Sequence, residues 1–116
     1  MIKVCQVVSD TNIGGAGRYL LNYVKSFNRE EFEVAVIIPE NSMLKPRLLE
    51  FSDIKIKEIP YMADKSFDRR AVAEIRKIFK ENMPDIVHTH ASLSARIAAK
   101  LEKVKTVIAT RHCIEP

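Results

Sequence analysis

Five short runs of β-branched and other apolar residues alternate with four amphipathic stretches along this chain of 116 residues. This alternation limits the fold more than any other feature, because strands separated by helices form a parallel sheet with right-handed crossovers. Helices then cover both faces of the sheet, and the length allows a single domain. The predicted strands are residues 2–8, 34–38, 54–59, 86–89 and 106–110.

The stretches between these runs carry apolar residues at the three- and four-residue spacing of an amphipathic helix. Leu93, Ile97, Ala98 and Leu101 form one such stripe. Asp68 is a predicted N-cap, because its carboxylate can accept hydrogen bonds from the free amides at a helix start. The predicted helices contain residues 16–27, 43–51, 72–79 and 93–101.

The strand order follows from the burial that each run requires. Continuously apolar runs are typical of strands buried on both faces, whereas the run at 54–59 alternates Ile with charged residues and is predicted at one edge. We predict the order 3-2-1-4-5, in a Rossmann-like three-layer αβα sandwich. In this order the winding reverses between the first and fourth strands, where ligands bind outside the carboxyl ends. The loops at 9–18 and 88–94 are expected to meet there.

The first of these loops holds all three glycines of the chain. Glycine lets a backbone approach a ligand closely, and the free amides and dipole of the following helix attract anions. We therefore predict a diphosphate at Gly14, Gly15 and Ala16, with a tight strand-to-helix turn that binds nothing as the alternative. The spacing matches neither the dinucleotide-binding fingerprint nor a Walker loop.

Three polar residues beside the glycines are candidates for lining the same pocket. Ser9 and Asp10 follow the first strand directly. Arg18 is placed on the first helical turn, where its guanidinium either pairs with phosphate in a bidentate manner or is solvated on the surface. All three are predicted to bind the acceptor or to line the pocket.

Two histidines alternate at the end of the fourth strand, so their side chains point to the same face. His90 is the predicted catalytic residue, because at the strand's end it could donate to a sugar or phosphate or transfer a proton. Its alternative is a purely structural role. His88 is expected deeper, buried and hydrogen-bonded. Ser92 is a pocket candidate in the same loop, and Arg111 and His112 either line the pocket or end the fifth strand.

Composition and spacing argue against several partners. The net charge is +4 and Lys and Arg are spread along the chain, so no nucleic-acid partner is expected. Such a surface also suits phosphorylated substrates or anionic membranes. The histidines and the two cysteines lack the spacing of a zinc site, so no metal is expected. Without a signal peptide or an apolar run of ~18 residues, the expected location is the cytoplasm, with peripheral contact at the inner membrane face as an addition.

Several segments together resemble one known family. They are residues 2–10, the glycine-containing segment 14–18, the Pro-Asp-Ile-Val-His-Thr-His stretch at 84–90, residues 94–99 and the closing segment 110–112. In this combination the chain resembles the N-terminal domain of glycosyltransferase family four, the large retaining group with the GT-B fold. The resemblance covers almost the whole chain, and it depends on the two loops together rather than on a Gly-Gly pair alone.

The resemblance implies a fold and a reaction. Such enzymes have two Rossmann-type domains that face each other across a cleft, with the acceptor mainly on the N-terminal one and the nucleotide-sugar mainly on the C-terminal one. It implies that Gly14 and Gly15 approach the donor diphosphate and that His90 lies near the transferred sugar. It further implies a hexosyl-type glycosyltransferase that retains anomeric configuration. No metal or cofactor is implied, because the nucleotide-sugar is a substrate.

Residues 1–116 contain no counterpart of the family's C-terminal domain. The expectation is therefore a single, partial acceptor-side domain that is inactive alone and needs the missing domain as a partner. The donor sugar and the acceptor stay open. Many relatives carry an acidic residue near the second glycine, where this chain has Gly17 and Arg18, and this difference leaves the acceptor class open.

Two further hypotheses follow from the pattern. One is a flavodoxin-like module that binds a phosphorylated ligand or partner without catalysing a reaction. A signalling receiver domain is less consistent with the sequence, because it needs an acidic cluster after the first strand and an Asp after the third.

The other hypothesis concerns assembly. The fifth strand, residues 106–110, is expected to be an exposed edge through which a homodimer or strand exchange forms.

Overall fold

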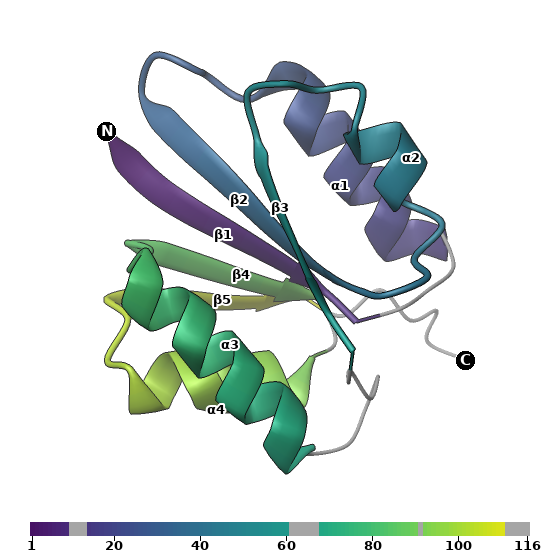
Figure 1. The fold of residues 1–116 in the computed structure, drawn as a ribbon. Helices are drawn as coiled ribbons and strands as arrows, with labels where there is room; N and C mark the ends of the chain where they lie inside the picture. The colour runs from purple at the N-terminus through teal and green to yellow at the C-terminus, as the bar shows by residue number, and fades with distance from the viewer. Residues whose placement is uncertain (10–13, 61–67, 91, 111–116) are drawn as a thin grey trace, which may run out of the picture.

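The computed structural model describes residues 1–9, 14–60, 68–90 and 92–110. Strands and helices alternate along the chain, as Figure 1 shows. The elements are β1 (Ile2–Val8), α1 (Gly14–Ser26), β2 (Phe32–Pro39), α2 (Lys45–Leu48), β3 (Lys55–Ile59), α3 (Arg69–Glu81), β4 (Ile86–His90), α4 (Leu93–Leu101) and β5 (Thr106–Thr110).

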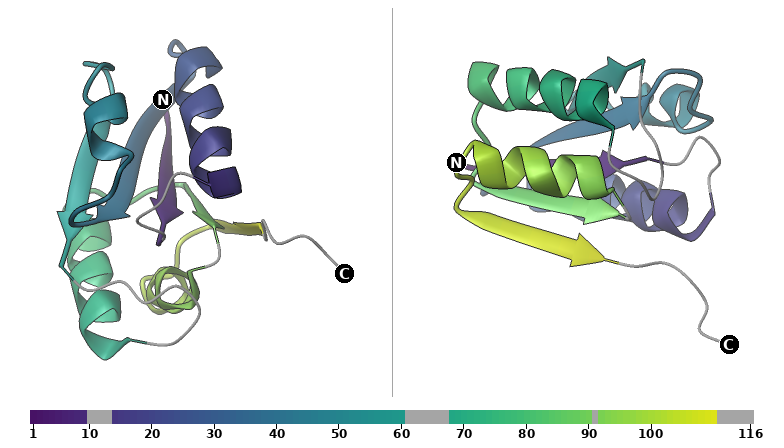
Figure 2. Two further views of the ribbon diagram at one scale, coloured as in Figure 1. Left: turned by 90° about the vertical axis from the view of Figure 1, so that its right-hand side faces the viewer. Right: turned by 90° about the horizontal axis from the view of Figure 1, so that it is seen from below.

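All five strands form one parallel sheet in the order β3-β2-β1-β4-β5, which confirms the predicted order. Helices α1 and α2 cover one face and α3 and α4 cover the other (Figures 1 and 2). This is the predicted three-layer αβα sandwich. The central strand β1 pairs with both β2 and β4, and at its carboxyl end Val8 pairs with His90.

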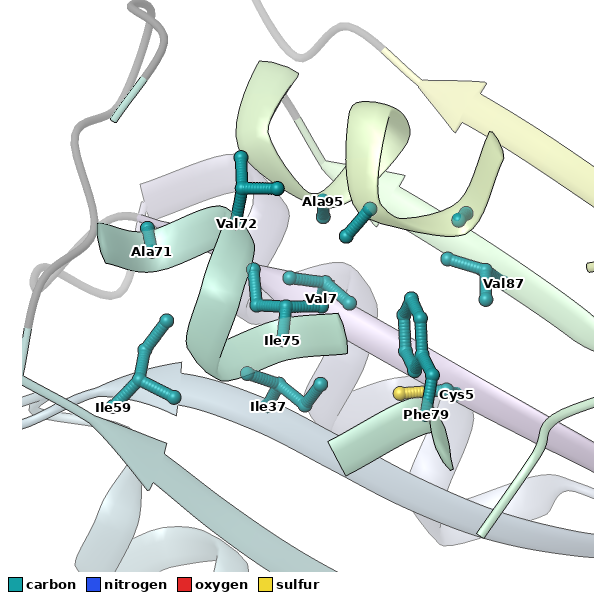
Figure 3. Close-up of a cluster of buried hydrophobic side chains, with 12 residues drawn as sticks. Cys5, Val7, Ile37, Ile59, Ala71, Val72, Ile75, Phe79, Val87 and Ala95 are labelled. Carbon is teal, nitrogen blue, oxygen red and sulfur yellow. The ribbon is translucent and has the colours of Figure 1, made fainter. Parts of the chain in front are cut away.

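Each face of the sheet has its own apolar core, because alternate residues of a strand point to opposite faces. On the α3 and α4 face, Cys5, Val7 and Ile37 lie beneath Ile75 and Phe79 (Figure 3). The Cys5 thiol is 3% exposed, and its burial raises the pKa to about 12. Cys5 is therefore a core residue, as predicted. On the opposite face the core contains Val4, Val8, Leu20, Leu21, Val24, Val34, Val36, Ile38, Leu44, Leu48 and Ile54.

Several element boundaries differ from the prediction, including those of β2, which spans Phe32–Pro39 instead of 34–38. Helix α1 begins at Gly14, so the glycines belong to its first turn rather than to a preceding loop. Helix α2 spans only four residues instead of the predicted 43–51, and Pro46, which has no amide hydrogen, lies at its start. Strand β4 extends to His90, one residue further than expected.

The start of α3 agrees with the prediction. The carboxylate of Asp68 accepts hydrogen bonds from the backbone amides of Arg70, at 2.9 Å, and Ala71, at 3.4 Å. An N-cap of this kind satisfies amides that have no partner within the helix. Among the described helices, none is both long and apolar enough to cross a membrane.

Helix α4 is rotated relative to its apolar stripe. Its buried residues are the small ones, Ser94, Ala95, Ala98 and Ala99. Leu93 and Leu101, which the stripe suggested were core residues, are 37% and 52% exposed. The reason is packing distance: alanine side chains let α4 lie close against α3 and the sheet, and this arrangement leaves the larger residues outside. Ala98 alone of that stripe is fully buried.

Candidate functional site

The carboxyl ends of β1 and β4 lie side by side at the point where the winding of the sheet reverses. The pairing of Val8 with His90 joins the two ends directly. Helix α1 follows β1, and helix α4 follows β4, so both helices begin near this edge (Figure 1). In this fold, ligands bind at such a reversal.

The first turn of α1 presents open backbone at this edge. Gly14 has φ +44°, a conformation that favours glycine, and a Cβ atom there would meet nothing within 4 Å. The backbone conformation, rather than lack of space, therefore requires glycine at this position. Gly14 and Gly15 are exposed and Ala16 is half-buried. The first turn contains no acidic residue, so no carboxylate within that turn offsets the positive end of the helix dipole.

Arg18 differs from its predicted place. Because α1 begins at Gly14, Arg18 falls in the second helical turn and not in the first. Its side chain is exposed. Both readings of this residue, phosphate partner or solvated surface residue, are compatible with that position.

His90 lies under α1 instead of pointing out of the edge. Its side chain is 1% exposed, its Nε2 is 2.8 Å from Oε1 of Gln6, and its ring lies 5.1 Å from that of Tyr19. With the amide oxygen accepting, Nε2 carries the proton. The sequence predicts His88 as the deeper residue, yet His88 is 8% exposed. The order is reversed because Tyr19 of α1 packs over the end of β4.

His88 is buried and hydrogen-bonded, as predicted. Its Nε2 lies 2.6 Å from Oγ1 of Thr110, across the β4–β5 pair. The two imidazole rings are 4.2 Å apart, and Tyr19 meets His88 edge-on at 5.4 Å. Thr110, His88, His90 and Gln6 thus form a continuous row of polar side chains, which we call the imidazole row. It runs across three neighbouring strands on the α1 face.

Gln6 is the residue that sequence reasoning missed. It is 1% exposed in the middle of β1 and connects the imidazole row to α1. Burial raises the pKa of Tyr23, and a hydrogen bond with Gln6 and the proximity of Tyr19 act on it to a smaller extent, in opposite directions. A single amide side chain inside the otherwise apolar run 2–8 was the available signal. Buried amides of this kind are retained where partners satisfy them.

The remaining candidates divide into buried residues and residues outside the described part. Ser9 is 3% exposed at the end of β1. Ser92 is fully buried and caps α4, where its hydroxyl accepts from the Ala95 amide at 3.2 Å. Ser92 therefore has a structural role at the start of α4, and its place in a pocket stays a prediction. Asp10, Arg111 and His112 lie outside the described residues.

Two other kinds of site were considered. In the described part of the chain, no group of three or more His, Cys, Asp or Glu residues could hold a metal ion. A hollow of about 270 Å³ lies at the opposite, amino-terminal edge of the sheet, lined by residues that include Lys3, Lys57, Phe79 and Asn82. It is separate from the edge where β1 and β4 end.

Comparison with known proteins identifies both a family and a fold. Residues 13–116 match the sequence model of Glycosyltransferase Family 4. Among solved structures, the C-terminal domain of a hydrogenase from Pyrococcus furiosus has a TM-score of 0.64 and 14% identity, over 94% of this chain and 91% of that one. No curated protein matches the chain at a significant level.

Two sugar-nucleotide epimerases share the fold as well. UDP-GlcNAc 2-epimerase from Neisseria meningitidis, solved with bound UDP-GlcNAc, has a TM-score of 0.61 and 16% identity over 90% of this chain. Another UDP-N-acetylglucosamine 2-epimerase has a TM-score of 0.61 and 17% identity over 95% of this chain. The aligned region covers only 31% and 32% of these two epimerase chains.

Proposed function

This chain belongs to Glycosyltransferase Family 4, and on that premise we propose that residues 1–116 form the acceptor-side domain of a retaining glycosyltransferase. The enzyme would transfer a hexose from a nucleotide-sugar, a substrate rather than a cofactor, to an acceptor. The observation that carries this proposal is the first turn of α1. It is open, contains glycine and lacks acidic residues, and it lies at the edge where β1 and β4 end.

The first turn of α1 suits the diphosphate of the donor. The amides of Gly14, Gly15 and Ala16 have no partner within the helix, so they can donate to phosphate oxygens. The charge that develops on a departing diphosphate would be stabilised by these donors and by the helix dipole. Exposed Arg18, one turn further along α1, could add a cation at the rim.

The imidazole row would form the floor of the same site. His90 remains our candidate for the residue nearest the transferred sugar. Tyr19, whose side chain is 40% exposed, packs over His90, so rotation of that ring would open the imidazole to a ligand. In the closed arrangement His90 holds the end of β4 against β1 through Gln6, which makes it a positioning residue.

A second domain would complete the active site. The related epimerase chains are about three times longer than the part that this chain covers. In the proposal, cationic groups of a C-terminal domain bind the nucleotide-sugar from the other side of the cleft. Residues 1–116 alone would then bind diphosphate weakly and transfer no sugar.

We place the protein in the cytoplasm, where nucleotide-sugars are available, with peripheral contact at the inner membrane face. Helices α3 and α4 support such contact because their outer sides are basic. Arg69, Arg70, Lys77, Lys80, Arg96 and Lys100 are all exposed there. A basic surface of this kind attracts anionic lipid headgroups.

The diphosphate site can be tested with inorganic pyrophosphate as the probe, followed by amide NMR of residues 1–116. We expect the Gly14, Gly15 and Ala16 amides to shift on titration. Gly15→Asp, which places a carboxylate at the positive end of α1, should weaken binding by roughly tenfold. Ser26→Asp adds the same charge at the other end of α1 and should leave affinity nearly unchanged. Equal losses in both variants, or shifts confined to the opposite edge, would refute the site.

The flavodoxin-like binding module remains the second candidate, and the burial of His90 favours it. A module of that kind needs an anion site but no exposed catalytic side chain. The two hypotheses predict different activities for a protein to which a nucleotide-sugar-binding domain has been added. An active two-domain protein that loses turnover with Gly15→Asp supports the enzyme, whereas pyrophosphate binding without turnover supports the module.

A further inference from the structure

The amide of Gln6 lies between two side chains that come from different elements. Gln6 is 1% exposed, so its hydrogen bonds are shielded from water. Its backbone pairs with His88, but its Oε1 lies 2.8 Å from Nε2 of His90, two residues further along β4 on the same face. Its other partner is the phenol of Tyr23 on α1, the helix that covers this face (Figure 1). One amide therefore joins a helix to the end of a strand.

The bond with Tyr23 indicates which way round the Gln6 amide lies. An amide side chain has an accepting oxygen and a donating NH2 group. Because Oε1 lies against His90, the NH2 group is the part of Gln6 that is left for the Tyr23 oxygen. The pKa of Tyr23 agrees with this direction: burial raises it, and the bond with Gln6 lowers it, as expected when a phenol oxygen accepts. Gln6 thus donates to Tyr23 and presents its acceptor to His90.

Tyr23 is held in place by its neighbours along α1. Its ring stacks against those of Tyr19, at 6.4 Å, and Phe27, at 5.7 Å, which lie four residues before and after it on the same side of the helix. The Arg29 guanidinium in turn lies 4.2 Å from the centre of the Phe27 ring. A phenol packed between two rings cannot turn away from Gln6 without losing both contacts. Its hydroxyl is therefore a fixed partner for the amide.

We propose that Tyr23 and Gln6 are positioning residues that fix the tautomer of His90, with the proton on Nε2 and a lone pair on Nδ1. An imidazole nitrogen that faces an accepting oxygen carries a proton, and the other nitrogen of a neutral ring then accepts. The bonds run from His90 Nε2–H to Gln6 Oε1, and from the Gln6 NH2 group to the Tyr23 oxygen. Reversing one group alone would set two donors or two acceptors against each other and leave a buried polar group unsatisfied.

The fixed tautomer limits which chemical groups His90 can bind. As long as the ring is neutral, any group that meets Nδ1 has to donate a hydrogen bond. The oxygens of an ionised diphosphate have no proton to donate, whereas a hydroxyl has one. In the proposed site, the α1 amides would then bind the diphosphate, and His90 would recognise a hydroxyl-bearing part of the ligand. This consequence rests on the proposed glycosyltransferase function, whereas the tautomer itself does not.

Long-range 1H–15N NMR of residues 1–116 at about pH 8, above the ordinary imidazole pKa of about 6.5, tests the tautomer directly. We expect His90 to have a protonated Nε2 and an unprotonated Nδ1. Because the side chain is 1% exposed, the Nε2 proton should exchange slowly with water. A proton on Nδ1 in the wild type, alone or together with one on Nε2, would overturn the proposal.

Three variants test the positioning roles. Gln6→Leu removes both bonds of the amide and keeps a side chain of similar size in an apolar strand, so it should give mixed tautomers and exchange of the ring proton about tenfold faster or more. Tyr23→Phe keeps the ring stack and removes only the accepting oxygen, so it should give a weaker change of the same kind. Tyr19→Phe makes the same substitution one turn earlier, in a ring 5.1 Å from that of His90, and should leave the tautomer unchanged. Equal effects of the two tyrosine variants, or an unchanged tautomer in Gln6→Leu, would overturn the assigned roles.

The tautomer and the diphosphate site can fail independently of each other. A single Nε2-protonated tautomer in a protein that does not bind pyrophosphate would uphold this inference and remove the support for the diphosphate site. Mixed tautomers in a wild-type protein that does bind pyrophosphate would overturn this inference and leave the proposed function standing.

Discussion

The two edges of the sheet are built from strands of equal length but opposite character. Strand β3 has the sequence Lys-Ile-Lys-Glu-Ile and strand β5 has Thr-Val-Ile-Ala-Thr. Two of the three charged residues of β3 form ion pairs: Lys45 Nζ lies 2.9 Å from Glu58 Oε2, and Lys55 Nζ lies 3.6 Å from Glu33 Oε2. The last residue of β3, Ile59, is buried, whereas no residue of β5 is.

The difference shows which edge is built to remain uncovered. Natural sheets protect a permanent edge with charged side chains, especially lysine, because another strand cannot easily pair there. Strand β3 follows this rule and β5 does not. Strand β5 therefore has the composition of an interior strand rather than that of a protected edge.

The two edge strands should contribute very differently to stability. Ile59→Ala removes a side chain that is 1% exposed in the α3 and α4 core, and we expect a loss of about 2–5 kcal/mol in the free energy of unfolding. Ile108→Ala removes one that is 45% exposed and should change it by about 0.5 kcal/mol or less. Urea denaturation measures both values.

An equal loss from the two substitutions would contradict the comparison, because it would mean that β5 packs as tightly as β3. The denaturant slope provides a check on this reading. A change in slope would report an altered denatured state instead of a lost contact.

Removing a charge from β3 should make the protected edge resemble the unprotected one. Lys57→Val leaves a strand with one fewer charge and one more β-branched residue, so we expect several-fold stronger light scattering during incubation at moderate temperature. Lys77→Val makes the same change on an exposed position of α3, where no strand edge is present, and should scatter as the wild type does. Equal scattering from both variants would show that lost charge, rather than edge protection, is responsible.

The fold was predictable because its main signals are local. Apolar runs mark β1 and β2, the Pro84-Asp85 turn precedes β4, and the alternating run marks β3 as an edge. The order of elements then leaves few topologies. Helix α4 was oriented wrongly because leucine is more apolar than alanine, so periodicity alone favoured the stripe of Leu93 and Leu101. Close packing against α3 selected the small residues instead.

The candidate site was predictable in position and less so in detail. Topology alone brings the ends of β1 and β4 together, and glycine content marks the start of α1. The depth of His90 could not be predicted, because it depends on where Tyr19 of α1 comes to lie over β4. Gln6 was missed for a related reason: a polar residue inside an apolar run gains meaning only when its partners, His90 and Tyr23, are known.

The smallest expected effect concerns the turn that leads into β3. There Arg29 forms an ion pair with Asp53 and also donates to the Val24 carbonyl at 2.6 Å, so the turn is tied to the end of α1. The hydrogen bond from Arg29 holds the pKa of Asp53 below its ordinary value of 3.8. Because folding lowers this pKa, the stabilisation from the pair is present above pH 3.8 and is lost as the pH falls through the folded-state pKa.

NMR titration of Asp53 measures the pKa shift directly. In Arg29→Gln the pKa should return toward 3.8, and in Asp53→Asn the stability of the protein should depend less on pH in this acidic range. An Asp53 pKa unchanged by Arg29→Gln would mean that the pair does not hold β3 in solution, and the contrast between the two edges would then depend on the strand residues alone.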